Sequence, residues 1–323
     1  MKPYSILLLF ACLLLAQCQP PAPGEAASAQ ERPVREEAAP TPKPDPEPVD
    51  SFQVDVHYSL LPMTDSGRKA FKAYSEAQQD IILSLSRLDA RHIGKKDTLV
   101  VPDTFATDLR SYAPFPFYMP VLKEVHKMVF FSYPAQAFAA YEQGRLVRWG
   151  PTSLGKKSTP TPTGLFFANW KARETISTVD DEWKLKWNFN IWNKGGVGWH
   201  EYAMPGYPAS HSCLRLLEPD AKFLYNWAHM WILKNNETLL AQGTPVLVYG
   251  EYPWGQGRPW LKLAGDPKAL DISKEALEEL IRPHLDNIMA KQQQRDSVIA
   301  ARQTQVAVPG NQNVLTDTAT TQN

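Results

Sequence analysis

The residues best suited to chemistry lie around Cys213, the one cysteine that remains once an N-terminal leader is set aside. His211 lies two residues before it and Arg215 two residues after it, and His200 lies upstream across a turn-rich loop. A thiol reacts as the thiolate, and a neighbouring imidazole or cation is the usual means of forming one at neutral pH. One unpaired cysteine flanked by two histidines therefore predicts a nucleophilic site.

Two stretches of the sequence resemble a known family. His200, a spacer and residues 210–215 (Ser-His-Ser-Cys-Leu-Arg) are similar to the signature of the L,D-transpeptidase (YkuD-type) catalytic domain. That signature is a His, a spacer, Ser/Thr-His-Gly-Cys, an apolar residue and then Arg or Asn. Residues 161–164 (Thr-Pro-Thr-Gly), in a loop that leads into a strand, give a second and independent match.

The sequence departs from the signature in two ways. Ser212 stands where the family has glycine, and the spacer after His200 is shorter than is common. Glycine is the usual choice where φ must be positive or where two backbones approach closely. Ser212 therefore predicts either a less demanding backbone or tolerated strain, whereas a loop can change length without moving its ends.

The resemblance implies a cysteine acyltransferase of the cell wall. The Cys213 thiolate would attack the amide that joins the third residue of a peptidoglycan stem peptide to a terminal D-residue. An amine from a neighbouring stem would then take the acyl group from the Cys213 thioester. His200 is the implied general base in both steps, and the carbonyl of Glu201 is a candidate to orient it.

The other motif residues have implied roles in binding the reacting groups. The N–H groups of Ser212 and Cys213 are the natural donors to a tetrahedral oxyanion. His211 either helps there or holds the loop, and Arg215 pairs either with a substrate carboxylate or with a local Asp or Glu. Ser210 is grouped with these as an oxyanion or substrate residue.

Two other functions fit the same residues. With water in place of the amine, the enzyme would be an L,D-carboxypeptidase or amidase that hydrolyses the same bonds. The third possibility is a non-catalytic wall-binding lipoprotein in which Ser212 marks a lost activity.

Residues 1–18 form a predicted export leader. Lys2 precedes an apolar run, 6–15, that is too short to span a bilayer. Residues 15–18 (Leu-Ala-Gln-Cys) resemble a lipoprotein processing box, although Gln17 is off the usual pattern; the alternative is an ordinary cleaved signal. Lipidation of Cys18 would make this a periplasmic or cell-envelope protein that is anchored to a membrane without spanning it.

Composition and residue spacing limit the classes of partner and cofactor that are expected. The chain has 323 residues and a formal net charge of +0, which gives no reason to expect a nucleic-acid partner. His211 and Cys213 are too few for a metal site, and no second Cys or His pair has ligand spacing, so neither a metal nor another cofactor is predicted. The expected partners are peptidoglycan stem peptides, and the expected state is a monomer.

The predicted fold class is mainly β. A YkuD-like β-sandwich or barrel with a few helices is expected after a small α/β subdomain and before a C-terminal helix. The predicted segments are the leader 1–18, a Pro-rich linker 19–50, the subdomain 51–123, the catalytic domain 124–265, the C-terminal helix 266–305 and a disordered tail 306–323. Within the subdomain, residues 78–102 resemble the second half of a LysM-like glycan-binding module. The alternative is a small subdomain that only packs against the catalytic domain.

Hydrophobic periodicity predicts the individual elements. Helices are expected over 67–88, 214–231 and 272–303, the last with a break near Pro283. Strands are expected over 125–132, 135–142, 145–149, 165–170 and 244–249, with a tight hairpin turn at 143–144 (Gln-Gly). Tryptophans crowd the stretch before His200, and most are expected to be core or edge aromatics, with some lining a groove: Trp170, Trp183, Trp187, Trp192 and Trp199.

Overall fold

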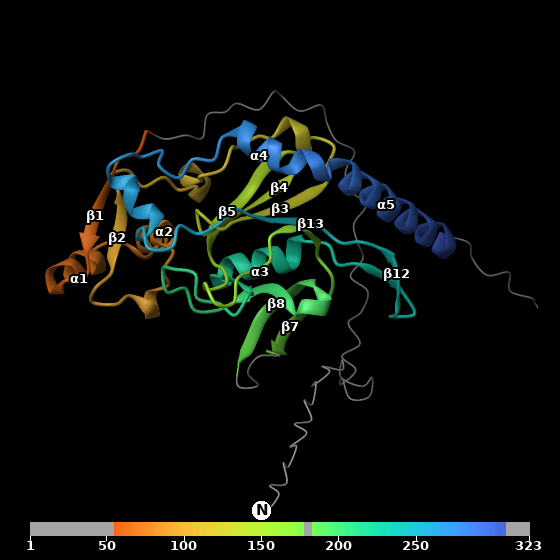
Figure 1. Ribbon diagram of the computed structural model, residues 1–323, viewed down its shortest axis with the longest axis horizontal. Helices are drawn as coiled ribbons and strands as arrows, with labels where there is room; N and C mark the ends of the chain where they lie inside the picture. The colour runs from red at the N-terminus through yellow and green to blue at the C-terminus, as the bar shows by residue number, and fades with distance from the viewer. Residues whose placement is uncertain (1–54, 178–182, 308–323) are drawn as a thin grey trace, which may run out of the picture. The chain divides into compact units, whose positions relative to one another are not determined.

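The described part of the protein is mainly β, as the sequence predicts. A computed structural model describes residues 55–177 and 183–307 (Figure 1). The predicted leader with Cys18, the linker 19–50 and the chain from residue 308 onward lie outside the described residues. Within that part of the chain, no helix combines the length and the apolarity needed to cross a bilayer.

The elements follow one another in the order shown by the colours of Figure 1. The strands are β1 (Tyr58–Pro62), β2 (Thr98–Pro102), β3 (Lys127–Ser132), β4 (Ala137–Glu142), β5 (Arg145–Ser153), β6 (Gly164–Phe167), β7 (Lys171–Ile176), β8 (Lys184–Trp192), β9 (Val197–Glu201), β10 (Leu214–Leu216), β11 (Ile232–Lys234), β12 (Thr238–Ala241) and β13 (Pro245–Tyr249). The α-helices are α1 (Asp65–Lys72), α2 (Glu76–Ser86), α3 (Glu218–Trp227), α4 (Lys274–Ile281) and α5 (Leu285–Ala307).

One 9-stranded sheet organises the fold, in the order β6-β13-β3-β4-β5-β10-β9-β8-β7. The pairs β13–β3 and β10–β9 are parallel, and the other neighbours are antiparallel. The hairpin between β4 and β5 turns at Gln143 (φ 48°) and Gly144 (φ 77°). Two successive positive φ values are the mark of a type I′ turn, so the predicted tight turn is confirmed.

The core of the protein includes most of β3 and β4 and extends along the sheet to residues of β8, β9 and β10. β3 and β4 are buried along almost their whole length, because their residues are apolar on both faces. Phe130, Phe131 and Phe138 are each 0% exposed. Strands with two buried faces show continuous apolar runs rather than alternation, which is why the sequence marks them so clearly.

The N-terminal subdomain is a two-stranded antiparallel sheet, β1–β2, with α1 and α2 between its strands. The single helix predicted over 67–88 is wrong, since the chain breaks at 73–75. Ser75 begins α2 through a capping box: its side chain accepts from the N–H of Gln78, and the Gln78 side chain accepts from the N–H of Ser75. A capping box favours a new helix start over continuation of the first one.

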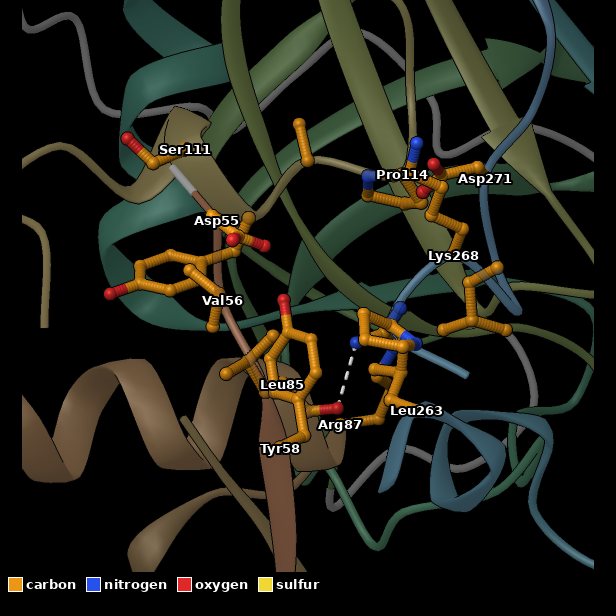
Figure 2. A pocket seen from close by; sticks show the side chains of 14 residues that line it. Asp55, Val56, Tyr58, Leu85, Arg87, Ser111, Pro114, Leu263, Lys268 and Asp271 are labelled. Carbon is orange, nitrogen blue, oxygen red and sulfur yellow. Dashed lines mark hydrogen bonds between the residues drawn. The ribbon is translucent and has the colours of Figure 1, made fainter. Parts of the chain in front are cut away.

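Arg87 joins the subdomain to the main sheet. It has φ 57° directly after α2 and is 1% exposed. Its Nε donates to the carbonyl of Ala135 at 3.1 Å, and its guanidinium lies 5.7 Å from the ring of Trp149 and 5.5 Å from that of Trp260. Burial lowers the pKa of Arg87 to about 9. Figure 2 shows Arg87 beside Tyr58 among the residues that line a pocket at this junction.

The structure corrects one further prediction and confirms another. The helix predicted over 214–231 is wrong at its start, because residues 214–216 form β10 between β5 and β9 and α3 begins only at Glu218. Pro219 lies in the first turn of α3, where its missing N–H costs nothing. The break predicted near Pro283 is confirmed: a short 3-10 turn, Arg282–His284, separates α4 from α5.

Candidate active site

Cys213 and His200 come from two adjacent parallel strands. His200 lies in β9, and Cys213 directly precedes β10, whose Arg215 is paired in register with His200. Both side chains line one pocket, together with those of Trp183, Tyr202, His211 and Arg215 among others. Strand pairing therefore brings together the residues that the sequence placed on either side of a loop.

Cys213 is a free and partly exposed cysteine. Burial of the thiol raises its pKa, whereas a hydrogen bond from the N–H of Gly198 and the charge of Arg215 lower it; the net pKa is above its ordinary value of 9.0. The resting group at neutral pH is therefore the thiol. Attack on a carbonyl then requires a base that removes the proton as the reaction proceeds.

His200 is suited to be that base. It is 3% exposed, and burial lowers its pKa to about 4 in spite of the opposing hydrogen bond to the carbonyl of Glu201. Its Nδ1 lies 2.9 Å from that carbonyl oxygen, which can only accept. The proton of the neutral ring is therefore on Nδ1, and Nε2 carries the lone pair.

Ser210 and Ser212 shape the backbone around Cys213. Ser210 is 1% exposed; its hydroxyl donates to the carbonyl of Cys213, and its N–H donates to Leu154 at 3.0 Å. Ser212 has φ 78°, and its hydroxyl donates to the carbonyl of His211. Of the two alternatives for Ser212, the structure shows the strained one, a left-handed conformation that costs a side-chain-bearing residue about 1–2 kcal/mol.

His211 is held by a lysine that sequence reasoning missed. The Nζ of Lys156 lies 2.8 Å from Nε2 of His211. An ammonium group only donates, so Nε2 accepts and the ring proton is on Nδ1. That Nδ1 is buried and has no hydrogen-bond partner among the described residues. Burial, then Lys156 and Arg215, lower the pKa of His211, so the ring is a neutral donor with a free N–H.

The loop that carries Lys156 docks on the cysteine motif. Gly155 forms a parallel bridge with Ser210, and the carbonyl of Ser210 accepts from the N–H of Lys156 at 3.0 Å and from the hydroxyl of Thr159 at 3.1 Å. The loop that leads into the 161–164 stretch therefore lies against the cysteine motif. The match of 161–164 to the family was the available sequence signal for Lys156, because it marked this part of the chain without marking the residue.

Trp183 and Tyr202 also line the pocket. The guanidinium of Arg215 lies 4.6 Å from the ring of Tyr202, and its Nη1 donates to the carbonyl of Ala203 at 3.4 Å. Trp183 lies 6.0 Å from Tyr202 and 5.2 Å from His211, measured between ring centroids. Sequence reasoning missed Tyr202, which has no signal beyond its place in the spacer.

The tryptophans before His200 differ in burial and in position. Trp199 is 0% exposed and belongs to the core, whereas Trp183 lines the pocket and Trp192 is 40% exposed. Within residues 55–177 and 183–307, no three His, Cys, Asp or Glu side chains converge as metal ligands.

Comparison with known families agrees with this geometry. Residues 126–248 match the YkuD L,D-transpeptidase catalytic domain. The matched segment contains His200, Cys213 and the 155–164 loop, and it falls inside the predicted catalytic segment 124–265. A comparison with curated proteins gives no match.

Solved structures with some likeness are also L,D-transpeptidases. The L,D-transpeptidase (Yku) of Stackebrandtia nassauensis is 24% identical, with a TM-score of 0.33, over 40% of this chain and 57% of that one. The L,D-transpeptidase from Mycobacterium smegmatis is 22% identical, with a TM-score of 0.31, over 39% and 59%. One from Mycobacterium tuberculosis H37Rv is 21% identical, with a TM-score of 0.31, over 39% and 58%. The match spans less than two thirds of each of these chains.

Proposed function

We propose that this protein is an L,D-transpeptidase that transfers acyl groups between peptidoglycan stem peptides through a Cys213 thioester. The observation that supports it best is the pairing of β9 with β10, which gives one pocket a thiol and a buried, neutral imidazole with a free Nε2. The family match of residues 126–248 supports the substrate class.

In the first step, His200 takes the proton of Cys213 on Nε2 while the sulfur attacks the carbonyl carbon of the stem amide. The tetrahedral oxyanion receives hydrogen bonds from the N–H groups of Ser212 and Cys213. The C–N bond then breaks, and His200 returns the proton to the departing amine of the D-residue. The product is a thioester on Cys213.

In the second step, an amine from another stem attacks the thioester carbonyl and gives its proton to His200. The C–S bond breaks, and the thiolate of Cys213 regains the proton from the imidazolium. Arg215, held against Tyr202, faces the pocket and is suited to a carboxylate of the stem peptide. Ser210 holds the Cys213 carbonyl and so fixes the peptide unit beside the oxyanion donors.

Purified protein with a defined tetrapeptide stem tests this proposal. Intact-protein mass spectrometry is expected to show an acyl adduct on the wild type that disappears when an acceptor stem is added, with a cross-linked dimer as product. Cys213→Ser is expected to show neither adduct nor dimer and to unfold at the wild-type temperature. Transfer retained by Cys213→Ser would overturn the proposal, and free tripeptide without dimer would favour the hydrolytic alternative.

We also propose that Cys18 carries a lipid that anchors the protein to a membrane of the cell envelope. The leader pattern supports this proposal, and the 19–50 linker would give the enzyme reach. Metabolic labelling with a radioactive fatty acid tests it. Label is expected on the wild type and not on Cys18→Ala; equal labelling of both would contradict the anchor.

A further inference from the structure

The segment between His200 and Ser210 is fixed from two sides. On the side of the main sheet, the hydroxyl of Ser153 donates to the carbonyl of Tyr207 at 2.8 Å and accepts from the N–H of Ala209 at 3.2 Å. Nearer to His200, the N–H of Tyr202 donates to the carbonyl of Leu216 at 3.2 Å. These bonds belong to the domain that carries the reacting groups.

On its other side, the segment is fixed by the N-terminal subdomain. The N–H of Asp89 donates to the carbonyl of Met204 at 3.0 Å, and the N–H of Met204 donates back to Oδ2 of Asp89 at 2.8 Å. Leu88 and Pro205 form an antiparallel bridge next to this pair. Met204 is 0% exposed, so its two backbone bonds are made away from water.

The contact is also closely packed. Gly206 has φ 78°, and a Cβ there would lie 3.1 Å from Cδ2 of Leu88 and 3.1 Å from Nη1 of Arg258. Arg258 in turn pairs with Asp97 of the subdomain at 2.7 Å. Gly206 therefore lies in direct contact with Leu88 of the subdomain and with Arg258, which is bound to it.

The carboxylate of Asp89 bonds to Met204, Arg91 and His92 at once. Its Oδ2 accepts from Met204, while its Oδ1 accepts from the N–H groups of Arg91 at 2.8 Å and His92 at 3.1 Å, which begin the short 3-10 helix Ala90–His92. Nδ1 of the His92 ring lies 2.8 Å from Oδ1 and 2.7 Å from Oδ2. Burial raises the pKa of Asp89, but the hydrogen bonds from Met204, His92 and Arg91 outweigh it, and the net pKa is below its ordinary value.

We propose that Asp89 is a positioning residue of the active site, through which the N-terminal subdomain sets the path of the segment that joins the base to the nucleophile. This inference rests on the proposed transpeptidase function. Met204 directly follows Ala203, whose carbonyl accepts from Arg215, and Glu201, whose carbonyl orients His200, lies on the same short path. A shift at Met204 therefore reaches both a substrate-facing residue and the base.

Asparagine at position 89 cannot replace both functions of the carboxylate. Its amide has one accepting oxygen and one donating nitrogen, so one of the two sets of N–H donors would face an NH2 group. Asparagine and serine are both good N-caps, and Asp89→Ser keeps a cap for the 3-10 helix while it shortens the side chain away from Met204. Together, Asp89→Asn and Asp89→Ser distinguish the effect of losing the bond to Met204 from the effect of losing the cap of the 3-10 helix.

The chain offers a matched control. Asp108 caps the 3-10 helix Leu109–Tyr112 in the same way, accepting from the N–H of Arg110 at 2.9 Å, and its hydrogen bonds do not involve the 201–209 segment. Asp108→Asn therefore removes a comparable charge at a comparable cap and leaves the loop contact intact.

The test measures hydrogen exchange of the Met204 and Tyr202 amides, the rate of iodoacetamide alkylation of Cys213, and kcat and KM with a defined stem peptide. Both Asp89 variants are expected to speed exchange at these amides and to change the alkylation rate. They are also expected to lower kcat/KM about 10- to 100-fold, the size of effect that a small misplacement produces. Asp108→Asn is expected to match the wild type in all three.

Wild-type exchange and alkylation in both Asp89 variants would overturn the inference, whatever the activity. If the wild type transfers no stem peptide, the proposed function fails, but exchange and alkylation still decide whether Asp89 sets the loop. If Asp89→Asn does not fold, Asp89→Ser, which keeps the cap, decides by the same measurements.

Discussion

The two halves of the main sheet differ in regularity. The more regular half contributes mainly to stability, and the less regular half contains the candidate site. β3, β4 and β13 are almost continuously buried, and β3 keeps an unbroken register with both of its neighbours. β7 and β8 are partly exposed, and the pairing of β8 with β9 shifts register twice. The left-handed residues Trp187 and Ser212 lie in or beside this second half, as do His200 and Cys213. Irregular backbone is tolerated there because the regular half supplies the stability.

The largest expected effect lies in the regular half. Phe130→Ala removes a fully buried ring that packs edge-on against Tyr141 at 5.7 Å and Tyr249 at 6.4 Å. We expect the free energy of unfolding to fall by about 4 kcal/mol, as for other buried aromatic-to-alanine changes. Urea denaturation measures it. Ile176→Ala in β7, at a side chain that is 56% exposed, is the control and should change stability by less than about 0.5 kcal/mol. Equal losses would remove the distinction between the two halves.

The second effect is a pH dependence in the irregular half. Unfolded His200 takes up a proton near its ordinary pKa of 6.5, whereas the folded pKa is about 4. Above pH 6.5 both states are neutral; as pH falls towards 4 only the unfolded state gains the proton, so unfolding is favoured. Between pH 7 and 4 we expect the wild type to lose about 3 kcal/mol relative to His200→Gln.

The wild type is compared with His200→Gln because a second buried group changes the stability in the opposite direction as pH falls. Burial raises the pKa of Asp220 to about 6, so its folded form takes up a proton first and stability rises as pH falls. Asp220 is present in both proteins, and its contribution cancels in the difference. Parallel stability curves for wild type and His200→Gln would contradict the placement of a neutral, buried imidazole.

A smaller effect is expected at Lys156. Lys156→Met removes the donor to Nε2 of His211 and the charge that lowers the pKa of that ring. We expect kcat/KM to fall about 10-fold, because a small displacement of a group in the site lowers the rate. We also expect the pKa of His211 to rise towards its ordinary value, because the charge of Lys156 no longer lowers it, and an NMR titration of the imidazole measures this change. Lys157→Met, at the exposed next residue, is the control, and an unchanged His211 titration in Lys156→Met would contradict the pairing.

The smallest effect tests the strain itself. Ser212→Gly relieves a left-handed backbone at φ 78° but adds freedom to the unfolded chain, so we expect a gain of about 0.5 kcal/mol in unfolding free energy. Differential scanning calorimetry should show a slightly higher melting temperature. A lower melting temperature would mean that the hydroxyl bond to His211 matters more than the strain.

The sequence predicted the strands of the regular half better than it predicted β10. Continuous apolar runs predicted β3, β4 and β13 closely, and Gln143-Gly144 predicted the turn between β4 and β5. β10 was hidden because its three residues run directly into the periodicity of α3. The hairpin of β11 and β12 was missed as well, since both strands are short and partly exposed.

The candidate site was predictable where it depends on a motif and unpredictable where it depends on packing. His200, His211, Cys213 and Arg215 were singled out by the motif, and all four line one pocket. Lys156 and Asp89 contact the candidate site from distant segments, which one sequence does not encode in any local pattern. Pairwise contacts of this kind become visible only once the strand order is known.

The parallel pairing of β9 and β10 has a consequence for divergence among related sequences. His200 and Cys213 are brought together by hydrogen-bonded strands rather than by the residues that connect them. Insertions or deletions in the connection can therefore accumulate over generations and reshape the mouth of the pocket, while these two residues keep their spacing. Under the proposed function, substrate range can drift in such a lineage without any change in the underlying reaction.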